Sequence, residues 1–441
     1  MDSQTPITSS AAGVQSGVIL HDAPVRRRSV FAGTAGNLVE WFDWSVYGIF
    51  VAVFAPLFFP VGNQAAAILS GLAVFAVGFF MRPLGGAVIG SFADHHGRQA
   101  GMTLTISLMA AASLIMALVP TYSSIGILAP IILVIGRCLQ GFSAGGEFGT
   151  SSAFLVENAP AGKRASVGMW QQVSVGGGTL IASILAVFMF SALTPEQLTS
   201  WGWRVPFFLG ALFGLFGLYI RLRVPDTAIS EHVRAKDLVP RSPLFTVFKQ
   251  YPREAFRVMG IVAMGTALTQ FWFVTLPAMM RALPENPMPQ NEAQPAATIG
   301  LAVFTVLLPV FGKLSDKFGR RPLLLFFALG TALVSVPLLY FVQPTFPSLL
   351  IVAISGGVFC SAYGASLAAV MAEQFPPQVR NAGISLPYGV SVALFGGTIP
   401  VIATALQASG HFNVFLWIMV IGALLTAILF WKMPETKDID I

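Results

Sequence analysis

Residues 90–99 read G-S-F-A-D-H-H-G-R-Q, and residues 312–321 read G-K-L-S-D-K-F-G-R-R. Both stretches fit the pattern G-x-x-x-D-x-x-G-R, with Asp94 and Asp316 at the same place, and each joins one long apolar run to the next. A long pattern that returns once, between runs of membrane-spanning length, indicates two like halves rather than a solenoid of short repeats.

A second motif follows each copy of the first. Residues 157–164 read E-N-A-P-A-G-K-R, and residues 373–380 read E-Q-F-P-P-Q-V-R, so both fit E-x-x-P-x-x-x-R. Because the two motifs recur in the same order, the division of the chain into two halves does not depend on one of them alone.

Composition places the protein in a membrane. Of its 441 residues 55% are hydrophobic and only 10% are charged, whereas soluble proteins carry about 25% charged residues. The apolar residues come in runs of about twenty, the length that crosses a bilayer as a helix. The formal net charge of +6 lies in short segments between these runs, so it does not indicate nucleic-acid binding. Cys138 and Cys360 lie inside apolar runs, which favours buried thiols over a disulfide.

Twelve spans can be placed, and the long polar stretch between the sixth and the seventh divides them. The predicted spans are 31–58, 66–92, 101–120, 124–150, 166–192, 203–222, 254–281, 295–315, 321–342, 347–371, 382–407 and 412–432. The predicted organisation is a cytoplasmic tail at 1–30, with disorder expected over 1–25, an N-terminal six-helix half at 31–222, a cytoplasmic linker at 223–253, a C-terminal six-helix half at 254–433 and a cytoplasmic tail at 434–441. The expected fold class is an all-α membrane protein with twelve transmembrane helices.

The distribution of Lys and Arg predicts the orientation. With the N-terminus inside, every base except Arg82, Arg137, Arg204 and Arg281 falls in a cytoplasmic segment or at its helix ends. The positive-inside rule therefore predicts that both termini and both G-x-x-x-D-x-x-G-R loops are cytoplasmic. We expect a multi-pass protein of the inner cell membrane.

The loop motifs predict a gate. Asp94 can face the positive N-terminus of a neighbouring helix, and Arg98 can pair with Glu157 at the end of span four. In the other half Asp316, Arg320 and Glu373 would make the same set. Such pairs would hold the cytoplasmic side shut in one state and break in the other. The alternative is that these residues are topology determinants and solvated surface charges.

Charged residues inside the spans need a reason, because each costs at least about 2.5 kcal/mol to insert. Glu40 and Asp43 lie three residues apart on one face of span one. Arg82 lies in span two, and Arg137 and Glu147 lie in span four. We expect the acids to carry the coupled proton, with Asp43 ahead of Glu40 and Glu147, and the arginines to bind substrate carboxylate. The alternative, that acids and arginines neutralise one another, does not exclude these roles.

Polar and aromatic residues in other spans complete the predicted substrate site. Each alone is more often a helix–helix contact than a ligand. The candidates besides Arg82 and Arg137 are Gln140, Gln171, Gln270, Trp272, Tyr363 and Tyr388.

The paired loop motifs resemble those of the major facilitator superfamily. Residues 36–48, 137–149, 201–207 and 373–383 are similar to its metabolite:proton symporter family, which includes carriers of α-ketoglutarate, citrate, shikimate and proline or betaine. The resemblance implies twelve helices, a central cavity and proton-coupled uptake by alternating access. It carries the loop acid and arginine of the family onto the two G-x-x-x-D-x-x-G-R copies described above.

These observations predict a proton-coupled symporter that imports a small organic acid, α-ketoglutarate or a related di- or tricarboxylate. Carriers of shikimate, citrate or a zwitterion such as proline or betaine are the alternatives, and a non-transporting sensor of the same fold is a distant one. The expected partners are the organic anion, protons and the lipid bilayer, without nucleic acid, and the protein is expected to function as a monomer. No cofactor beyond the proton gradient is expected. The five histidines do not form a metal-site pattern with Cys, Asp or Glu inside a span, so an enzyme is not expected.

Overall fold

The computed structural model describes residues 23–59, 64–281, 283 and 288–439. Within these residues the chain forms helices joined by turns, without a strand. Twelve helical segments of this part are long and apolar enough to cross a membrane. The all-α fold with twelve spans that the sequence predicts is confirmed.

The helices fall into three consecutive groups along the chain. The first group is α1 (Ala23–Phe58), α2 (Gln64–His96), α3 (Arg98–Leu118), α4 (Tyr122–Ile125), α5 (Leu128–Glu157), α6 (Arg164–Gly168), α7 (Trp170–Ala192), α8 (Pro195–Gln197), η1 (Leu198–Gly202) and α9 (Arg204–Arg221). Two short helices follow, α10 (Ala228–Ala235) and α11 (Pro243–Gln250). The last group is α12 (Pro252–Gln270), η2 (Phe271–Thr275), α13 (Leu276–Arg281), α14 (Gln290–Phe318), α15 (Arg320–Gly330), η3 (Thr331–Ser335), α16 (Val336–Tyr340), α17 (Phe346–Ala372), α18 (Arg380–Ser391), η4 (Val392–Gly396), α19 (Gly397–Ala408) and α20 (Phe412–Lys432).

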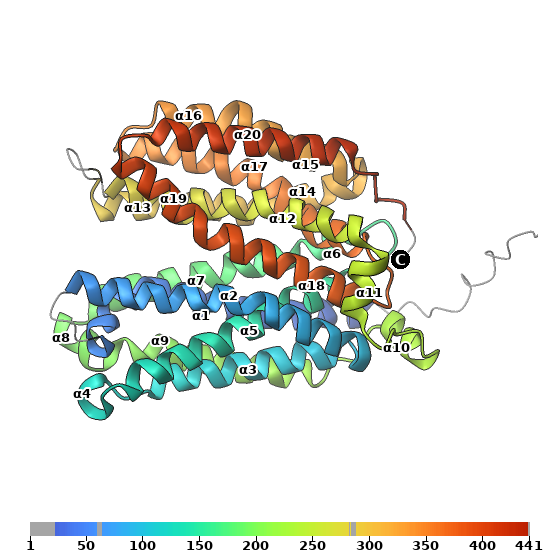
Figure 1. The fold of residues 1–441 in the computed structure, drawn as a ribbon, viewed down its shortest axis with the longest axis horizontal. Helices are drawn as coiled ribbons and strands as arrows, with labels where there is room; N and C mark the ends of the chain where they lie inside the picture. Colours follow the sequence, from blue (N-terminus) through green and yellow to red (C-terminus); the bar gives the residue numbers. More distant parts are fainter. Residues whose placement is uncertain (1–22, 60–63, 282, 284–287, 440–441) are drawn as a thin grey trace, which may run out of the picture.

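Two bundles of helices lie side by side in Figure 1, α1–α9 in blue to green and α12–α20 in yellow to red. Within the first bundle α2 packs on α5, where Gly141 and Gly145 let α5 approach the backbone carbonyls of Gly78 and Arg82. Between the bundles α18 lies against α2 and α5, and α14 lies against α6 and α7. Further contacts between the bundles join α17 to α5 and α6 and η4 to α2, so a site between the bundles is lined by both.

Three spans of the second bundle contain a π-helical turn that the sequence did not predict. The turns η2, η3 and η4 interrupt the predicted spans seven, nine and eleven. A π-helical turn inserts one residue into an α-helix and is frequent at functional sites. Hydropathy does not detect it, because the side chains stay apolar.

The N-terminal helix is longer than predicted. The sequence predicts disorder over 1–25 and a first span from residue 31, but α1 begins at Ala23 and includes the basic run 26–28. Pro24 suits the first turn of a helix and Arg has a high helix propensity, whereas hydropathy reports only the apolar part. Residues 1–22, the rest of the predicted tail, lie outside the described residues. The linker predicted at 223–253 contains α10 and α11, and the boundaries of the predicted halves stay predictions.

Candidate functional site

A cavity of about 150 Å³ lies between the two bundles. Its walls come from α1, α2 and α7 on one side and from α12, η2, α14, α17, α18 and η4 on the other. Three of the predicted substrate residues line it: Gln270, Tyr363 and Tyr388. None of its described lining residues is Asp, Glu, Lys, Arg or His.

An aromatic layer separates this cavity from the two arginines predicted to bind substrate. Trp41 and Phe79 form part of the cavity wall. The guanidinium of Arg82 lies behind them, 5.1 Å from the ring centre of Phe79 and 4.5 Å from that of Trp44. Arg137 lies on the same Trp44, 4.1 Å from its ring centre. Trp44 therefore contacts both cations, and neither arginine is among the described residues that line the cavity.

Arg137 is fully buried without a carboxylate in ion-pair contact among the described residues. Tyr47 and Phe75 join Trp44 around it, with ring centres 4.4 and 4.9 Å from the guanidinium carbon. Its Nη1 donates to Gln140 Oε1 at 2.6 Å, while Nε and Nη2 have no hydrogen-bond partner. Cation–π contacts offset part of the cost of burying this charge, and the unpaired donors leave a binding position for an anion.

Asp43 is connected to Arg137 through two neutral side chains. Its Oδ2 accepts a hydrogen bond from Ser113, and its Oδ1 is buried without a partner. The amide of Gln140 donates to the same Ser113 hydroxyl at 3.5 Å while its oxygen binds Arg137. Gly210 of α9 packs directly on the Asp43 carboxylate, where a Cβ would not fit. A polar chain thus runs from the arginine to the acid within one bundle.

The other two candidate proton carriers are paired with cations. Glu40 lies 3.3 Å from Arg82, with Oε2 free of a partner. Glu147 accepts from Arg221 with both oxygens and also from Thr105. Of the three acids, Asp43 alone has no arginine in direct contact in the described part of the chain.

The remaining predicted substrate residues face other helices. Gln171 accepts from Ser151, and Trp272 is buried next to Gly356. Neither is among the described residues that line the cavity. Tyr388, which does line it, stacks on Phe148 of the other bundle with ring centres 3.8 Å apart and planes at 8°. This pair connects α5 of the first bundle to α18 of the second.

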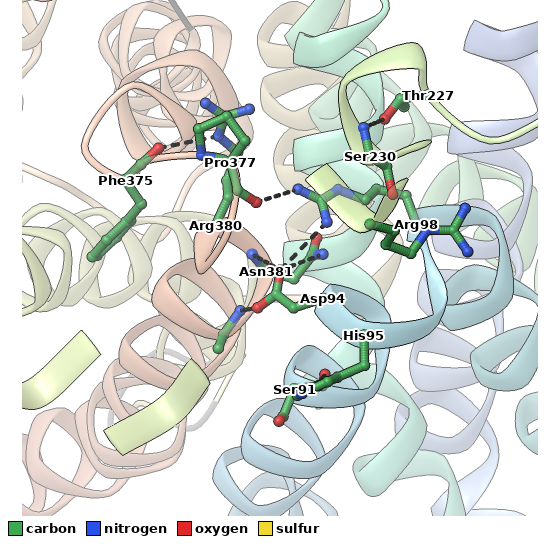
Figure 2. Close-up of polar contacts among 12 residues, drawn as sticks. Ser91, Asp94, His95, Arg98, Thr227, Ser230, Phe375, Pro377, Arg380 and Asn381 are labelled. Carbon is green, nitrogen blue, oxygen red and sulfur yellow. Dashed lines mark hydrogen bonds and ion pairs between the residues drawn. The ribbon is translucent and has the colours of Figure 1, made fainter. Parts of the chain in front are cut away.

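The first loop motif closes the end of the molecule. The Asp94 carboxylate accepts hydrogen bonds from the backbone N–H groups of Asn381 and Ala382, at 3.2 and 3.0 Å, and from the Asn381 amide at 2.9 Å. These groups belong to the first turn of α18, in the other bundle. The acid therefore faces a positive helix N-terminus, as the sequence predicts. Figure 2 shows this contact between the end of α2 and α18.

Arg98 extends the same contact. It binds Glu157 with two nitrogens, at 3.2 and 2.9 Å, so the predicted pair is present. It also donates to the carbonyl of Pro377 in the other bundle at 2.7 Å, a bond that can be followed in Figure 2. Glu157 in turn accepts from Arg380 at 2.7 Å. We call Asp94, Arg98 and Glu157, with their partners Arg380 and Asn381, the first cluster.

The second loop motif makes a matching set, the second cluster. Asp316 accepts from the backbone N–H groups of Ala165 and Ser166 in α6, both at 2.9 Å. Arg320 binds Glu373 at 3.3 and 2.8 Å, so this predicted pair is also present. Arg164 lies 3.7 Å from Glu373 across the two bundles. Each loop acid thus caps a helix of the opposite bundle. We call the end of the molecule that holds both clusters the charged end.

A third repeated motif, missed from the sequence, supports both clusters. Residues 225–227 read P-D-T and residues 434–436 read P-E-T, each just after the last span of its half. Asp226 accepts from the backbone N–H groups that begin α3, and Glu435 accepts from those that begin α15. The two threonine hydroxyls donate to Glu157 and Glu373, each at 2.6 Å. The repeat was visible in the sequence and could have identified these residues.

The turn glycines of the loop motifs are required by conformation and by space. Gly97 has φ 104° and Gly319 has φ 103°, in the left-handed region that favours glycine. A Cβ at Gly97 would collide with the carboxylate of Asp226, and one at Gly319 with that of Glu435. The glycine and the supporting acid therefore depend on each other.

Comparison with known proteins gives the family. Residues 29–239 match the family model described as sugar (and other) transporter, and residues 273–440 match that of the major facilitator superfamily. An α-ketoglutarate permease of Escherichia coli is 36% identical over 92% of this chain and 93% of its own length. A citrate–proton symporter of Klebsiella pneumoniae is 34% identical over 87% of this chain and 88% of its own.

Solved structures agree at the level of the fold. The proton:xylose symporter XylE, bound to 6-bromo-6-deoxy-D-glucose, superposes with a TM-score of 0.77 at 21% identity, over 95% of this chain and 98% of that one. The repeated loop motifs, the twelve spans and the similarity over most of the length point to one conclusion: the chain belongs to the major facilitator superfamily of membrane transporters.

Proposed function

We propose that the protein is a proton-coupled symporter that imports a small organic acid, α-ketoglutarate or a related di- or tricarboxylate, by alternating access. The similarity to a permease and a symporter named for such acids supports the substrate class. The structural observation that carries it is Arg137, a buried guanidinium with unpartnered donors behind the wall of the cavity. Arginine is the side chain suited to bidentate capture of a carboxylate.

Substrate binding would then start in the neutral cavity. Gln270, Tyr363 and Tyr388 can hold the polar groups of the acid. Movement of the Trp41 and Phe79 side chains would let one carboxylate reach Arg82 or Arg137. Gln140 would act by holding Arg137, whereas a binding role for Gln171 or Trp272 stays a prediction.

Proton coupling would run through Asp43, with Glu40 and Glu147 as further candidates. Substrate bound to Arg137 neutralises the cation whose field reaches Asp43 through Gln140 and Ser113. An unpaired buried carboxylate is costly, and binding a proton relieves that cost. Proton and substrate would therefore favour each other's binding, and the coupling must be reciprocal.

The two clusters would act as the gate at the charged end. In the first cluster, α18 of the opposite bundle is held by Asp94, Arg98 and Glu157. In the second cluster, α6 and its Arg164 are held by Asp316, Arg320 and Glu373, as described above. For the cavity to open at this end, the bonds that cross between the bundles must break. The structure has them formed.

We further propose that the charged end faces the cytoplasm of the cell, that both termini lie there, and that the protein is in the inner membrane. The concentration of Lys and Arg in the segments at this end supports that orientation. The proton gradient would be the only energy source, with no bound cofactor, and one chain would suffice for transport.

Uptake into vesicles tests the proposal. The purified protein would be reconstituted, a pH gradient imposed, and a panel of radiolabelled acids offered: α-ketoglutarate, citrate, shikimate and proline. Accumulation of a di- or tricarboxylate that a proton ionophore abolishes is the expected result. Binding of the acids without accumulation would instead indicate a sensor of this fold.

A carrier of a zwitterion such as proline or betaine is the second candidate. It is favoured by the absence of charged side chains among the described lining residues of the cavity. The same panel, with betaine added, separates the two, because a zwitterion carrier would accumulate proline or betaine and leave the dicarboxylates outside.

A further inference from the structure

We propose that α11 and its flanking residues form a docking surface for the anionic phospholipids around the protein. We call this surface the α11 face, made of Phe245, Phe248 and Lys249 with Arg241 and Arg253 on either side. It includes no residue of the cavity or of the two clusters described above.

The sequence of this segment is basic and aromatic. Residues 241–253 read R-S-P-L-F-T-V-F-K-Q-Y-P-R, with three bases and no acid. All three bases are exposed. A helix with bases and aromatic side chains on its free face is typical of segments that lie in the membrane interface.

The packing of α11 divides it into two faces. Pro243 and Val247 are buried, the valine completely. Phe245 and Phe248, three residues apart on the other side, are 67% and 40% exposed, and Lys249 lies 5.8 Å from the ring centre of Phe245. Exposing two phenylalanines to water would be unfavourable, so the free face needs a cover that is apolar and carries negative charge.

The position of α11 identifies the membrane as that cover. The span that contains α12 begins at Pro252, directly after the single residue that follows α11. The helix is thus confined to the surface of the bilayer. Figure 1 shows it at the end of the bundle, turned across the direction of the spans. It touches α2, α12 and α18, so it lies where the two bundles meet.

Anionic headgroups would pair with the bases of this surface. The two phenylalanine rings would lie deeper, where the headgroups meet the acyl chains. Each base near an anionic membrane surface contributes about fivefold in affinity. Phosphatidylglycerol should therefore bind the protein more tightly than phosphatidylcholine, by a factor that depends on Arg241, Lys249 and Arg253. A cytosolic protein with an acidic patch is the competing occupant.

Depth measurement provides the first test. A fluorophore would be attached to Phe245→Cys in a Cys138→Ala, Cys360→Ala background, with the protein in vesicles of phosphatidylcholine and phosphatidylglycerol. We expect strong quenching by a nitroxide carried on the lipid and weak quenching by iodide in the water. The matched control is Ala235→Cys, an exposed position on α10, which should show the reverse. If Phe245→Cys behaves like the control, the face points to water and the proposal is wrong.

Charge removal provides the second test. Lys249→Gln/Arg253→Gln should lower the affinity of the full-length protein for fluorescent phosphatidylglycerol by roughly 25-fold and leave that for phosphatidylcholine unchanged. Lys163→Gln/Lys236→Gln removes two other exposed bases and should change neither affinity. If both double variants lower the affinity for phosphatidylglycerol equally, the preference depends only on the net charge of the protein, and the proposed docking surface is wrong. Should the first pair fail to fold, the depth measurement decides alone.

Discussion

Arg137 combines two features that oppose each other energetically. Its charge is fully buried, yet two of its three nitrogens have no hydrogen-bond partner. An unpaired buried charge is kept only where something else requires it, and the surrounding rings of Trp44, Tyr47 and Phe75 supply only part of the compensation. A carboxylate bound during transport would supply the rest.

We therefore expect Arg137→Lys to weaken transport although the charge is kept. Lysine lacks the planar fork and its two parallel donors, so KM for the acid should rise about tenfold, the value of one charge-assisted bond. Initial rates of uptake into vesicles measure this. Arg204→Lys, on the outer part of the same bundle, is the control and should leave KM unchanged. Uptake by Arg137→Lys with unchanged rate and affinity would contradict the binding role.

Asp43 should separate exchange of substrate from its accumulation. Asp43→Asn cannot release a proton, so we expect counterflow of labelled substrate to continue while pH-driven accumulation is lost. The measurement compares the two modes in the same vesicles. Asp237→Asn, at an exposed position, is the control for the loss of an acid and should leave both modes unchanged. Retained accumulation by Asp43→Asn would move the proton site to Glu40 or Glu147.

At this scale the sequence reached some contacts and missed others for identifiable reasons. Helix ends and spacing were enough to expect that Asp94 faces a helix N-terminus and that Arg98 pairs with Glu157, since both motifs lie at helix ends that the topology places on the same side of the membrane. They were not enough to see that the arginines lie against aromatic rings outside the lining of the cavity. Periodicity gives the face of a helix, but not which neighbouring side chain lies in front of it.

At the scale of elements, the two clusters differ in strength although their motifs match. Asp94 accepts three hydrogen bonds from α18, and Arg98 adds one across the bundles to Pro377. Asp316 accepts two from α6. The crossing arginine of the second cluster, Arg164, is 3.7 Å from its acid, compared with 2.7 Å in the first cluster.

Asp94→Asn should therefore accelerate opening of the charged end, and disturb cycling, more than Asp316→Asn does. An amide keeps the shape but loses the charge that strengthens each bond, about 1.5–3 kcal/mol for the group as a whole. Exchange rates should change with little effect on substrate Kd. Asp237→Asn, at an exposed position, controls for the loss of an acid. If Asp94→Asn lowers only the amount of folded protein, the residue is a topology determinant.

The remote cap of α15 predicts a smaller, structural effect. Glu435 accepts from the first two backbone N–H groups of this helix, the role of an N-cap side chain supplied from another segment. Glu435→Ala should lower the free energy of unfolding by about 1 kcal/mol, seen as a lower Tm in detergent. Asp438→Ala, three residues further and exposed, should not change Tm. A Tm unchanged by Glu435→Ala would show that water replaces the cap.

At the scale of the whole molecule, each of the two clusters lies on a different contact between the bundles. One joins α2 and α5 to α18, and the other joins α14 to α6.

The π-helical turns η2 and η4 lie in the cavity wall of the second bundle, and the first bundle has none at the cavity among its described residues. The sequence predicted the number of spans because each span is a long apolar run. It indicated two like halves because the loop motifs recur in the same order. It did not predict these turns, because a one-residue insertion leaves hydropathy unchanged.

If the bundles move as rigid bodies, both clusters must break for the charged end to open. They share no residue, so their contributions to the closed state should add. Each neutralised cluster removes about 1.5–3 kcal/mol, which raises the open fraction roughly 10- to 150-fold. The double variant Asp94→Asn/Asp316→Asn should then raise it by the product of the two single effects.

Labelling of a buried cysteine measures that fraction. Ser385 is fully buried on α18, against Gly149 and Gly86 of the other bundle, so Ser385→Cys in a background without Cys138 and Cys360 should react with a maleimide only when the charged end opens. Ser361→Cys, equally buried between α14 and α17 within one bundle, should stay unreactive in every variant. A labelling rate in the double variant equal to that of the faster single variant would mean that one cluster alone holds the bundles together. No change in any variant would mean that the glycine-packed contact of α18 with α2 and α5 closes this end without the charges.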